Sequence, residues 1–223
     1  MKASEEKKVA FFGKITAGIT HEMKNVLAII KESSGLMEDI MSLSPEALIS
    51  YQEKFKNSLS KIKDQINRGV ELTDRLNKFA HSSDETIAKI DLNEIVEQLI
   101  KLSQRFARLK NVVLKTDPRQ RSDQPVIIET FPVQLQMALF ACIDSCLNVI
   151  PSGSEIFIRS HKKGEKYAVH VACEGNISSQ TDLARRILTS DQWPELEGIV
   201  AALGGSVELD SSGPGIWLFL SKE

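Results

Sequence analysis

A histidine, a glutamate and an asparagine fall within five consecutive residues of the segment 11–30, FFGKITAGITHEMKNVLAII. A neutral imidazole has an unperturbed pKa of about 6.5, so His21 could act as a nucleophile near neutral pH and carry a phosphoryl group on a ring nitrogen. Glu22 could accept a ring proton or fix the imidazole tautomer, and Asn25 could hydrogen-bond the phosphoryl group or a water molecule. The alternative is a surface histidine that is simply solvated.

The apolar residues around these three predict a long amphipathic helix that begins at about Phe11. They recur at steps of three, four or seven residues, which places them on an arc about 100° wide. This stripe consists of Ile15, Ile19, Met23, Val26, Ile30, Met37 and Ile40. His21 lies two residues from both Ile19 and Met23, so it points roughly 160–200° away from the stripe. Asn25 follows one turn later on the same outer face.

A second long helix is predicted after the break at SLSPEA, residues 42–47. Ser44 suits its N-cap, and Pro45 suits its first helical position. Its apolar residues are again near heptad spacing: Leu48, Phe55, Leu59, Ile62, Ile66, Leu76 and Phe79. Two long helices with a short connection form an antiparallel hairpin, and two hairpins bury their stripes best as a dimeric four-helix bundle. We therefore expect a homodimer.

Helices and short strands stand in separate groups in the rest of the chain. We expect helices at 91–110, 131–150 and 195–205, strands at 111–117 and 125–130, and hairpins at 154–175 and 206–222. Asp91 is the expected cap of the first of these helices, and the turn of the first hairpin is placed near Lys163 and Gly164. The fold class is therefore α+β with two domains, a helical hairpin at 1–86 and an α/β sandwich at 87–223.

The composition is that of a globular protein, with 42% hydrophobic and 26% charged residues and a net charge of -2. A chain without a basic excess is not expected to bind nucleic acid. No apolar run reaches the roughly 20 residues that span a bilayer, so no membrane segment is expected. Cys142, Cys146 and Cys173 lie in apolar segments without metal-ligand spacing, which indicates buried free thiols and a cytoplasmic protein.

The remaining histidines and the tryptophans are assigned to structure. We expect His81 at the exit of the hairpin, His161 in a solvated turn and His170 in an alternating strand, none of them as a ligand. Trp193 and Trp217 are expected to pack.

The stretch ITAGITHEMKNVLAII resembles the H-box of two-component sensor histidine kinases, whose His-Glu-x-x-Asn core lies on the first helix of a dimeric hairpin. This resemblance implies that His21 is the phospho-accepting residue. It implies that Glu22 is the acid/base partner and that Asn25 assists phosphatase or transfer chemistry.

The resemblance extends to the second domain. The entry helix and first strand of the kinase ATP-binding domain, of the GHKL type, resemble DLNEIVEQLIKLSQRFARLKNVVL. The N-box helix of that domain resembles QMALFACIDSCLNVIPSGSEIFI. Its last helix and hairpin resemble GIVAALGGSVELDSSGPGIWLFL. The positions that bind nucleotide depart from that pattern. Ala141 and Ser145 stand where the N-box supplies asparagines, and Cys173 and Ile177 stand at the aspartate and second glycine of the Asp-x-Gly-x-Gly loop.

These departures predict a domain that no longer binds ATP. Phosphoryl transfer from ATP depends on a bound Mg²⁺, and a cysteine cannot replace a carboxylate acceptor. The nucleotide lid and its glycine-rich segment are also missing, since residues 177–194 are short and resemble a small helix. An intact histidine hairpin on a degenerate ATPase-like domain resembles the dimeric histidine phosphotransferases of phosphorelays.

The expected function is therefore exchange of phosphoryl groups between His21 and the receiver aspartates of response regulators, without any cofactor on this chain. The receiver would supply the Mg²⁺. The alternative enzyme is a divergent sensor kinase that autophosphorylates His21 from ATP. A third possibility is an interaction module that docks kinases or receivers without chemistry.

Overall fold

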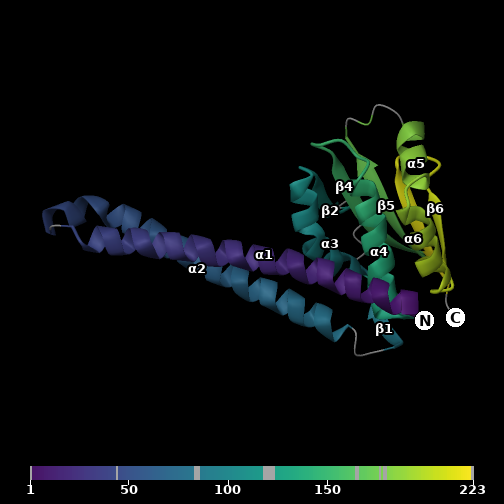
Figure 1. Cartoon of the computed structure of the whole chain (residues 1–223), viewed down its shortest axis with the longest axis horizontal. Helices are drawn as coiled ribbons and strands as arrows, with labels where there is room; N and C mark the ends of the chain where they lie inside the picture. The colour runs from purple at the N-terminus through teal and green to yellow at the C-terminus, as the bar shows by residue number, and fades with distance from the viewer. Residues whose placement is uncertain are drawn as a thin grey trace. The chain divides into compact units, whose positions relative to one another are not determined.

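The computed structural model describes residues 2–43, 45–82, 86–117, 124–163, 166–175, 177 and 180–221. The chain divides into two compact units, Gly13–Ala80 and Met1–Phe12 with His81–Glu223. The boundary that we expected near residue 86 differs from this division in the placement of residues 1–12 and 81–86. Both the helical hairpin and the α/β sandwich predicted from the sequence are present (Figure 1).

Two long helices, α1 (Lys2–Met41) and α2 (Pro45–His81), form the hairpin and run antiparallel (Figure 1). Pro45 occupies the first helical position of α2, as predicted, whereas the predicted N-cap Ser44 lies outside the described residues. A methyl group placed on Gly69 would lie 3.5 Å from Cγ1 of Val26 and 3.8 Å from Sδ of Met23, so this part of α2 lies directly against α1.

The predicted stripe of α1 is the face that the structure buries most. Its buried members are Ile15, Ile19, Val26 and Ile40, and its half-buried members are Met23, Ile30 and Met37. On α2, Leu72 and Phe79 are buried, whereas Leu59 and Ile66 are 45% and 50% exposed in the single chain. The side chain of Leu48 lies outside the described residues.

Helix α1 begins at Lys2, earlier than the sequence pattern indicated, and its first turns belong to the C-terminal unit. The ring of Phe11 packs on that of Phe140, with 5.6 Å between centroids. Nζ of Lys7 lies 3.3 Å from Oε1 of Glu195. Residues 1–12 are therefore part of the sandwich, held by the ring contact of Phe11 and the ion pair of Lys7.

The sandwich consists of a five-stranded sheet and three helices that pack on it, α3, α4 and α6 (Figure 1). The strand order is β2-β4-β5-β7-β6, with β2 parallel to β4 and all other neighbours antiparallel. The helices are α3 (Leu92–Leu109), α4 (Pro132–Leu147) and α6 (Gln192–Ala201), and the strands are β2 (Val113–Thr116), β4 (Glu155–Lys163), β5 (Lys166–Glu174), β6 (Ser206–Leu209) and β7 (Gly215–Leu220). These elements confirm the predicted helices, strands and hairpins within a few residues. Gly164, in the predicted turn of the first hairpin, lies outside the described residues.

A second, two-stranded sheet pairs β1 (Ala88–Asp91) with β3 (Ile127–Thr130). Strand β1 was not predicted from the sequence. Asp91 ends it and caps α3, because its Oδ1 accepts hydrogen bonds from the backbone N–H groups of Asn93 at 3.0 Å and Val126 at 2.9 Å. The predicted cap is thus confirmed, and the same carboxylate also fixes the chain before β3.

The remaining helix, α5 (Gln180–Leu188), is the small helix predicted between β5 and α6. Gly204 follows α6 with a φ of 68°, a left-handed conformation that glycine adopts without cost. A Cβ atom on Gly205 would lie 2.2 Å from the carbonyl oxygen of Phe219, so only glycine fits there. Among the described residues, no helix combines the length and apolarity that crossing a membrane requires.

Candidate functional site

His21 projects from the exposed side of α1, as the helical periodicity predicted. Its neighbours on the opposite side, Ile19 and Val26, are only 5% and 2% exposed. Asn25 is also exposed, one turn after His21. The hairpin therefore holds an imidazole and an amide side by side on a rigid helix, open to a partner.

Glu22 lies beside His21 in sequence, but its carboxylate is held by the second helix. Nη2 of Arg68 donates a hydrogen bond to Oε2 of Glu22 across the hairpin at 3.2 Å. The Glu22 side chain is 12% exposed and that of Arg68 is 38% exposed. The carboxylate next to the candidate nucleophile is therefore oriented by α2 and shielded from most of the solvent.

Arg68 is the residue of this site that sequence reasoning missed. The signal that could have found it is the symmetry of an antiparallel hairpin about its connection. Glu22 and Arg68 each lie 23 residues from Pro45, which begins α2, so the two helices bring them to the same level. An acidic and a basic residue at such matched positions predict an ion pair.

The positions that the sequence resemblance assigns to the nucleotide site of kinases lie on α4 and at the end of β5. Ser145 is 2% exposed, and its hydroxyl has no hydrogen-bond partner among the described residues. Oδ2 of Asp144 accepts a hydrogen bond from Nε2 of Gln192 at 3.0 Å. Oε1 of that same Gln192 accepts from Nδ2 of Asn148 at 3.4 Å. One glutamine thus joins the start of α6 to the last turns of α4.

Cys173 faces the core rather than a cleft. It is 2% exposed, and Cys142 and Cys146 are fully buried with it as free thiols, as predicted. Burial raises the pKa of Cys142 to about 12. The hydrogen bond to the Cys173 thiol, together with burial, raises the pKa of Cys146 well above its usual range. Cys142 and Cys146 therefore stay protonated, and all three side chains take part in packing.

A second group of titratable side chains lies on β4, on β5 and directly after β6, around Trp217 of β7. The ring of His170 stacks on Trp217 with 4.0 Å between centroids, and that of His161 lies 5.1 Å from the same tryptophan. Nε2 of His170 lies 2.8 Å from Oδ2 of Asp210. The prediction that His161 lies in a solvated turn was wrong, because β4 extends to Lys163 and carries His161 onto Trp217.

Burial dominates the titration of both histidines. It lowers the pKa of His170, and the nearby Asp210 carboxylate opposes that shift. Burial and the Arg159 guanidinium also lower the pKa of His161. Although burial alone would raise the pKa of Asp210, hydrogen bonds from Ser212 outweigh it and hold that pKa below its ordinary value. Both imidazoles are therefore favoured in the neutral form.

The prediction of an alternating strand around His170 was also wrong. Every residue of β5 from Tyr167 to Cys173 is buried, because the strand is covered on both faces. Both predicted tryptophans pack, Trp193 with 7% exposure and Trp217 against His170.

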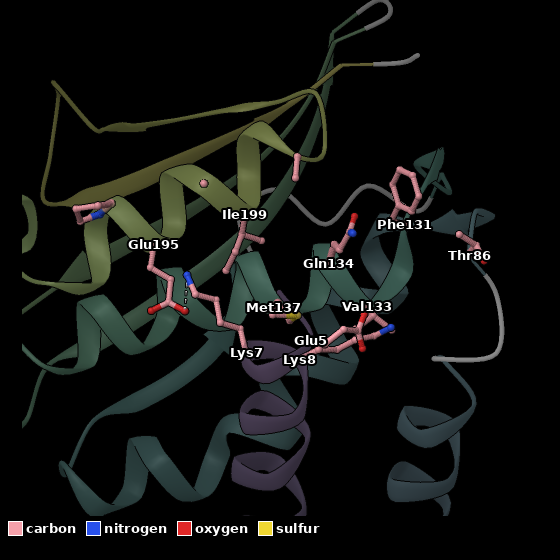
Figure 2. Close-up of a pocket in the computed structure, with 13 residues that line it drawn as sticks. Glu5, Lys7, Lys8, Thr86, Phe131, Val133, Gln134, Met137, Glu195 and Ile199 are labelled. Carbon is pink, nitrogen blue, oxygen red and sulfur yellow. Dashed lines mark ion pairs between the residues drawn. The ribbon is translucent and has the colours of Figure 1, made fainter. Parts of the chain in front are cut away.

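A cavity of about 560 Å³ opens in the C-terminal unit between the start of α1, the start of α4 and α6 (Figure 2). Its apolar wall includes Val133, Met137 and Ile199, and the ion pair between Lys7 and Glu195 lies at its edge. None of the predicted site residues lines it. Among the described residues, no group of histidine, cysteine, aspartate and glutamate side chains is arranged to hold a metal ion.

Comparisons with known proteins were made for the whole chain. No protein-family model matches the sequence, and no curated protein matches it. The solved structure of histidine kinase AdeS of Acinetobacter baumannii is 16% identical, with a TM-score of 0.47 over 91% of this chain and 98% of that chain. Histidine kinase ThkA in complex with response regulator protein TrrA is 18% identical, with a TM-score of 0.47 over 98% of this chain and 64% of that chain. The cytoplasmic segment of histidine kinase QseC is 14% identical, with a TM-score of 0.42 over 71% of this chain and 94% of that chain. All three are histidine kinases, the family that the His-Glu-x-x-Asn motif resembles.

Proposed function

We propose that this chain is a two-component signalling protein in which His21 accepts a phosphoryl group from a receiver aspartate and passes it to another. The observation that carries the proposal is the arrangement on α1. His21 and Asn25 are exposed one turn apart, and the Glu22 carboxylate between them is held by Arg68. This arrangement supplies a nucleophile, a proton acceptor and an amide for the phosphoryl oxygens.

We propose further that the protein does this without ATP. Three features of the described residues support this part. The thiol at the adenine-aspartate position, Cys173, is hydrogen-bonded to Cys146 in the core. Ser145 is buried, and Asp144 is engaged by Gln192. None of these three positions offers a free carboxylate or amide to a nucleotide or its Mg²⁺, so these residues do not fit a bound nucleotide.

The proposed active form is a homodimer in the cytoplasm. The hairpin leaves apolar side chains uncovered in the single chain, Leu27 on α1 and Leu59, Ile66 and Val70 on α2, with 57%, 45%, 50% and 56% exposure. Leu59, Ile66 and Val70 are spaced by seven and four residues and lie on one face of α2, which we call the α2 outer stripe. A second hairpin would cover this stripe in a four-helix bundle.

Two parallel labelling assays test the proposal. The purified chain is mixed with a receiver domain that carries ³²P on its aspartate, or with γ-³²P-ATP and Mg²⁺. His21→Ala removes the acceptor, and His81→Ala is the matched control, since His81 is an exposed histidine at the end of α2. We expect label only from the receiver, and only when His21 is present.

Each other outcome has a distinct meaning. Label that arrives from ATP would show a working kinase and would overturn the ATP-independent part of the proposal. Receivers that bind the chain but transfer no label would favour the interaction module.

A further inference from the structure

We infer that Arg68 is a positioning residue for phosphoryl transfer at His21, acting through Glu22. This inference rests on the proposed function and adds to it a residue from the second helix. The contact that carries it is the hydrogen-bonded ion pair between Nη2 of Arg68 and Oε2 of Glu22, at 3.2 Å.

The pair lies at the level of the reacting histidine. Gly69, the residue after Arg68, faces Met23 and Val26, so the Arg68 turn of α2 lies against the α1 turn that follows His21. The Glu22 side chain is 12% exposed, whereas that of Arg68 is 38% exposed. The carboxylate is thus enclosed between the helices, and the guanidinium extends from the pair toward solvent.

A glutamate without this partner would sample several rotamers, because its side chain has three rotatable bonds. A guanidinium presents a planar fork of N–H donors and restricts the carboxylate oxygens that accept from it. Arg68 therefore limits where the Glu22 carboxylate can lie relative to the imidazole that precedes it. Catalysis by a proton acceptor depends strongly on such positioning.

The transfer step shows what the carboxylate would do. The unprotonated ring nitrogen of His21 forms a bond to phosphorus while the bond from phosphorus to the receiver aspartate oxygen breaks, and the aspartate leaves with that electron pair. The ring then carries a positive charge and a proton on its other nitrogen. Glu22 accepts a hydrogen bond from that N–H, or the proton itself, and stabilises the phosphohistidine. The reverse steps return the phosphoryl group to a second receiver.

Two other roles would leave different signatures. A purely structural ion pair would affect stability but not the transfer rate. A direct contact between Arg68 and the receiver would raise the receiver concentration needed for half-maximal transfer. A positioning role lowers the maximal rate and leaves that concentration unchanged.

The experiment measures single-turnover transfer from a phosphorylated receiver to the full chain at increasing receiver concentration. We expect Arg68→Ala to lower the maximal rate about tenfold or more, with partial recovery in Arg68→Lys. Glu22→Ala should lower it at least as much, and the double variant should equal Glu22→Ala, because Arg68 acts through the carboxylate. The matched control is Arg75→Ala, which removes an arginine of α2 that pairs with Glu71 in the same helix, and it should transfer at the unaltered rate.

Exchanging the charges of Glu22 and Arg68 separates a positioning role of Arg68 from a purely structural role. The double variant Glu22→Arg with Arg68→Glu keeps an ion pair between the helices but removes the carboxylate next to His21, so we expect its transfer to stay as slow as that of Glu22→Ala. Circular dichroism checks that each variant remains helical.

An unaltered maximal transfer rate in the charge-exchanged double variant or in Arg68→Ala would overturn the inference. A change that affects only the receiver concentration needed for half-maximal transfer would also overturn it. In all these cases, transfer of label from the receiver that still requires His21 would leave the proposed function in place. An unaltered chain that takes no label from any receiver overturns both.

Discussion

The side-chain amide of Gln192 donates a hydrogen bond to the carboxylate of Asp144, with 3.0 Å between Nε2 and Oδ2. The bond joins the first residue of α6 to the C-terminal half of α4, beside the buried Ser145. In this protein α4, the helix whose sequence resembles the N-box, is thus bridged to α6 by the protein's own side chains.

Replacing Gln192 by alanine should destabilise the C-terminal unit without creating a nucleotide site. Loss of a hydrogen bond to a partly buried carboxylate costs about 1–2 kcal/mol in the free energy of unfolding. Urea unfolding followed by tryptophan fluorescence measures this change. Gln192→Glu places a second carboxylate opposite Asp144 and should destabilise more. Equal stability of both variants and the unaltered chain would contradict the assigned bond.

The α2 outer stripe should control association. Ile66→Glu places a charge at the centre of the stripe and should convert the proposed dimer to monomer, because burying an unpaired carboxylate in a bundle core is unfavourable. Analytical ultracentrifugation at several concentrations measures the mass. Leu109→Glu is the control, since Leu109 is 68% exposed on α3, outside the hairpin. A dimer that survives Ile66→Glu would place the interface elsewhere.

Mild acid should weaken the C-terminal unit. The folded state lowers the pKa of His170 and His161, so the unfolded chain binds more protons once the pH falls below about 6.5. The stability that comes from the neutral imidazoles is therefore present above that pH and lost as the pH falls toward 5. The Asp210 carboxylate adds a separate loss below its ordinary pKa of 3.8, since its folded pKa is lower still.

Urea unfolding at pH 7.5, 6.5, 5.5 and 5.0 measures this dependence, and His170→Asn should flatten it. The emission of Trp217, which stacks on His170, reports the same region locally. A free energy of unfolding that does not fall between pH 7.5 and pH 5 would show that the histidines titrate alike in both states.

The three cysteines should be inert until the C-terminal unit opens. Burial raises the pKa of Cys142 to about 12, and thiolate is the reactive form. Titration with 5,5′-dithiobis(2-nitrobenzoic acid) at pH 8 should detect close to no thiols in the native protein and three in guanidinium chloride. Rapid reaction of one native thiol would show that the core around it opens to solvent, and loss of that reaction in Cys173→Ala would assign it to Cys173.

Local sequence patterns were sufficient to predict the helices and to predict which side of α1 is exposed. The spacing of Ile15, Ile19 and Val26 fixes which way His21 points, because a helix has a constant rotation per residue. Asp91 could be identified as a cap from its type and place alone. The start of α1 was predicted too late, because residues 2–10 are mostly polar and their helix is stabilised by contacts of Lys7 and Phe11 with residues far along the chain.

Features that depend on pairing between distant segments could not be predicted. Strand β1 has four residues and forms only because β3, some 36 residues later, supplies its hydrogen-bond partner. The contact of His161 and His170 with Trp217 depends on the register of three strands. The pair of Arg68 and Glu22 differs from these, because it could have been predicted once the two helices were aligned about their connection.

Strand β5 lies in the middle of the sheet, between β4 and β7, and is buried on both faces. Its amide protons should therefore be among the slowest to exchange with deuterated solvent, since they are released only when the whole unit opens. The edge strands β2 and β6 have four residues each and should exchange sooner. Cys173 belongs to this slow segment. The position that the sequence resemblance assigns to the nucleotide-binding aspartate of kinases should therefore be among the last in this protein to open.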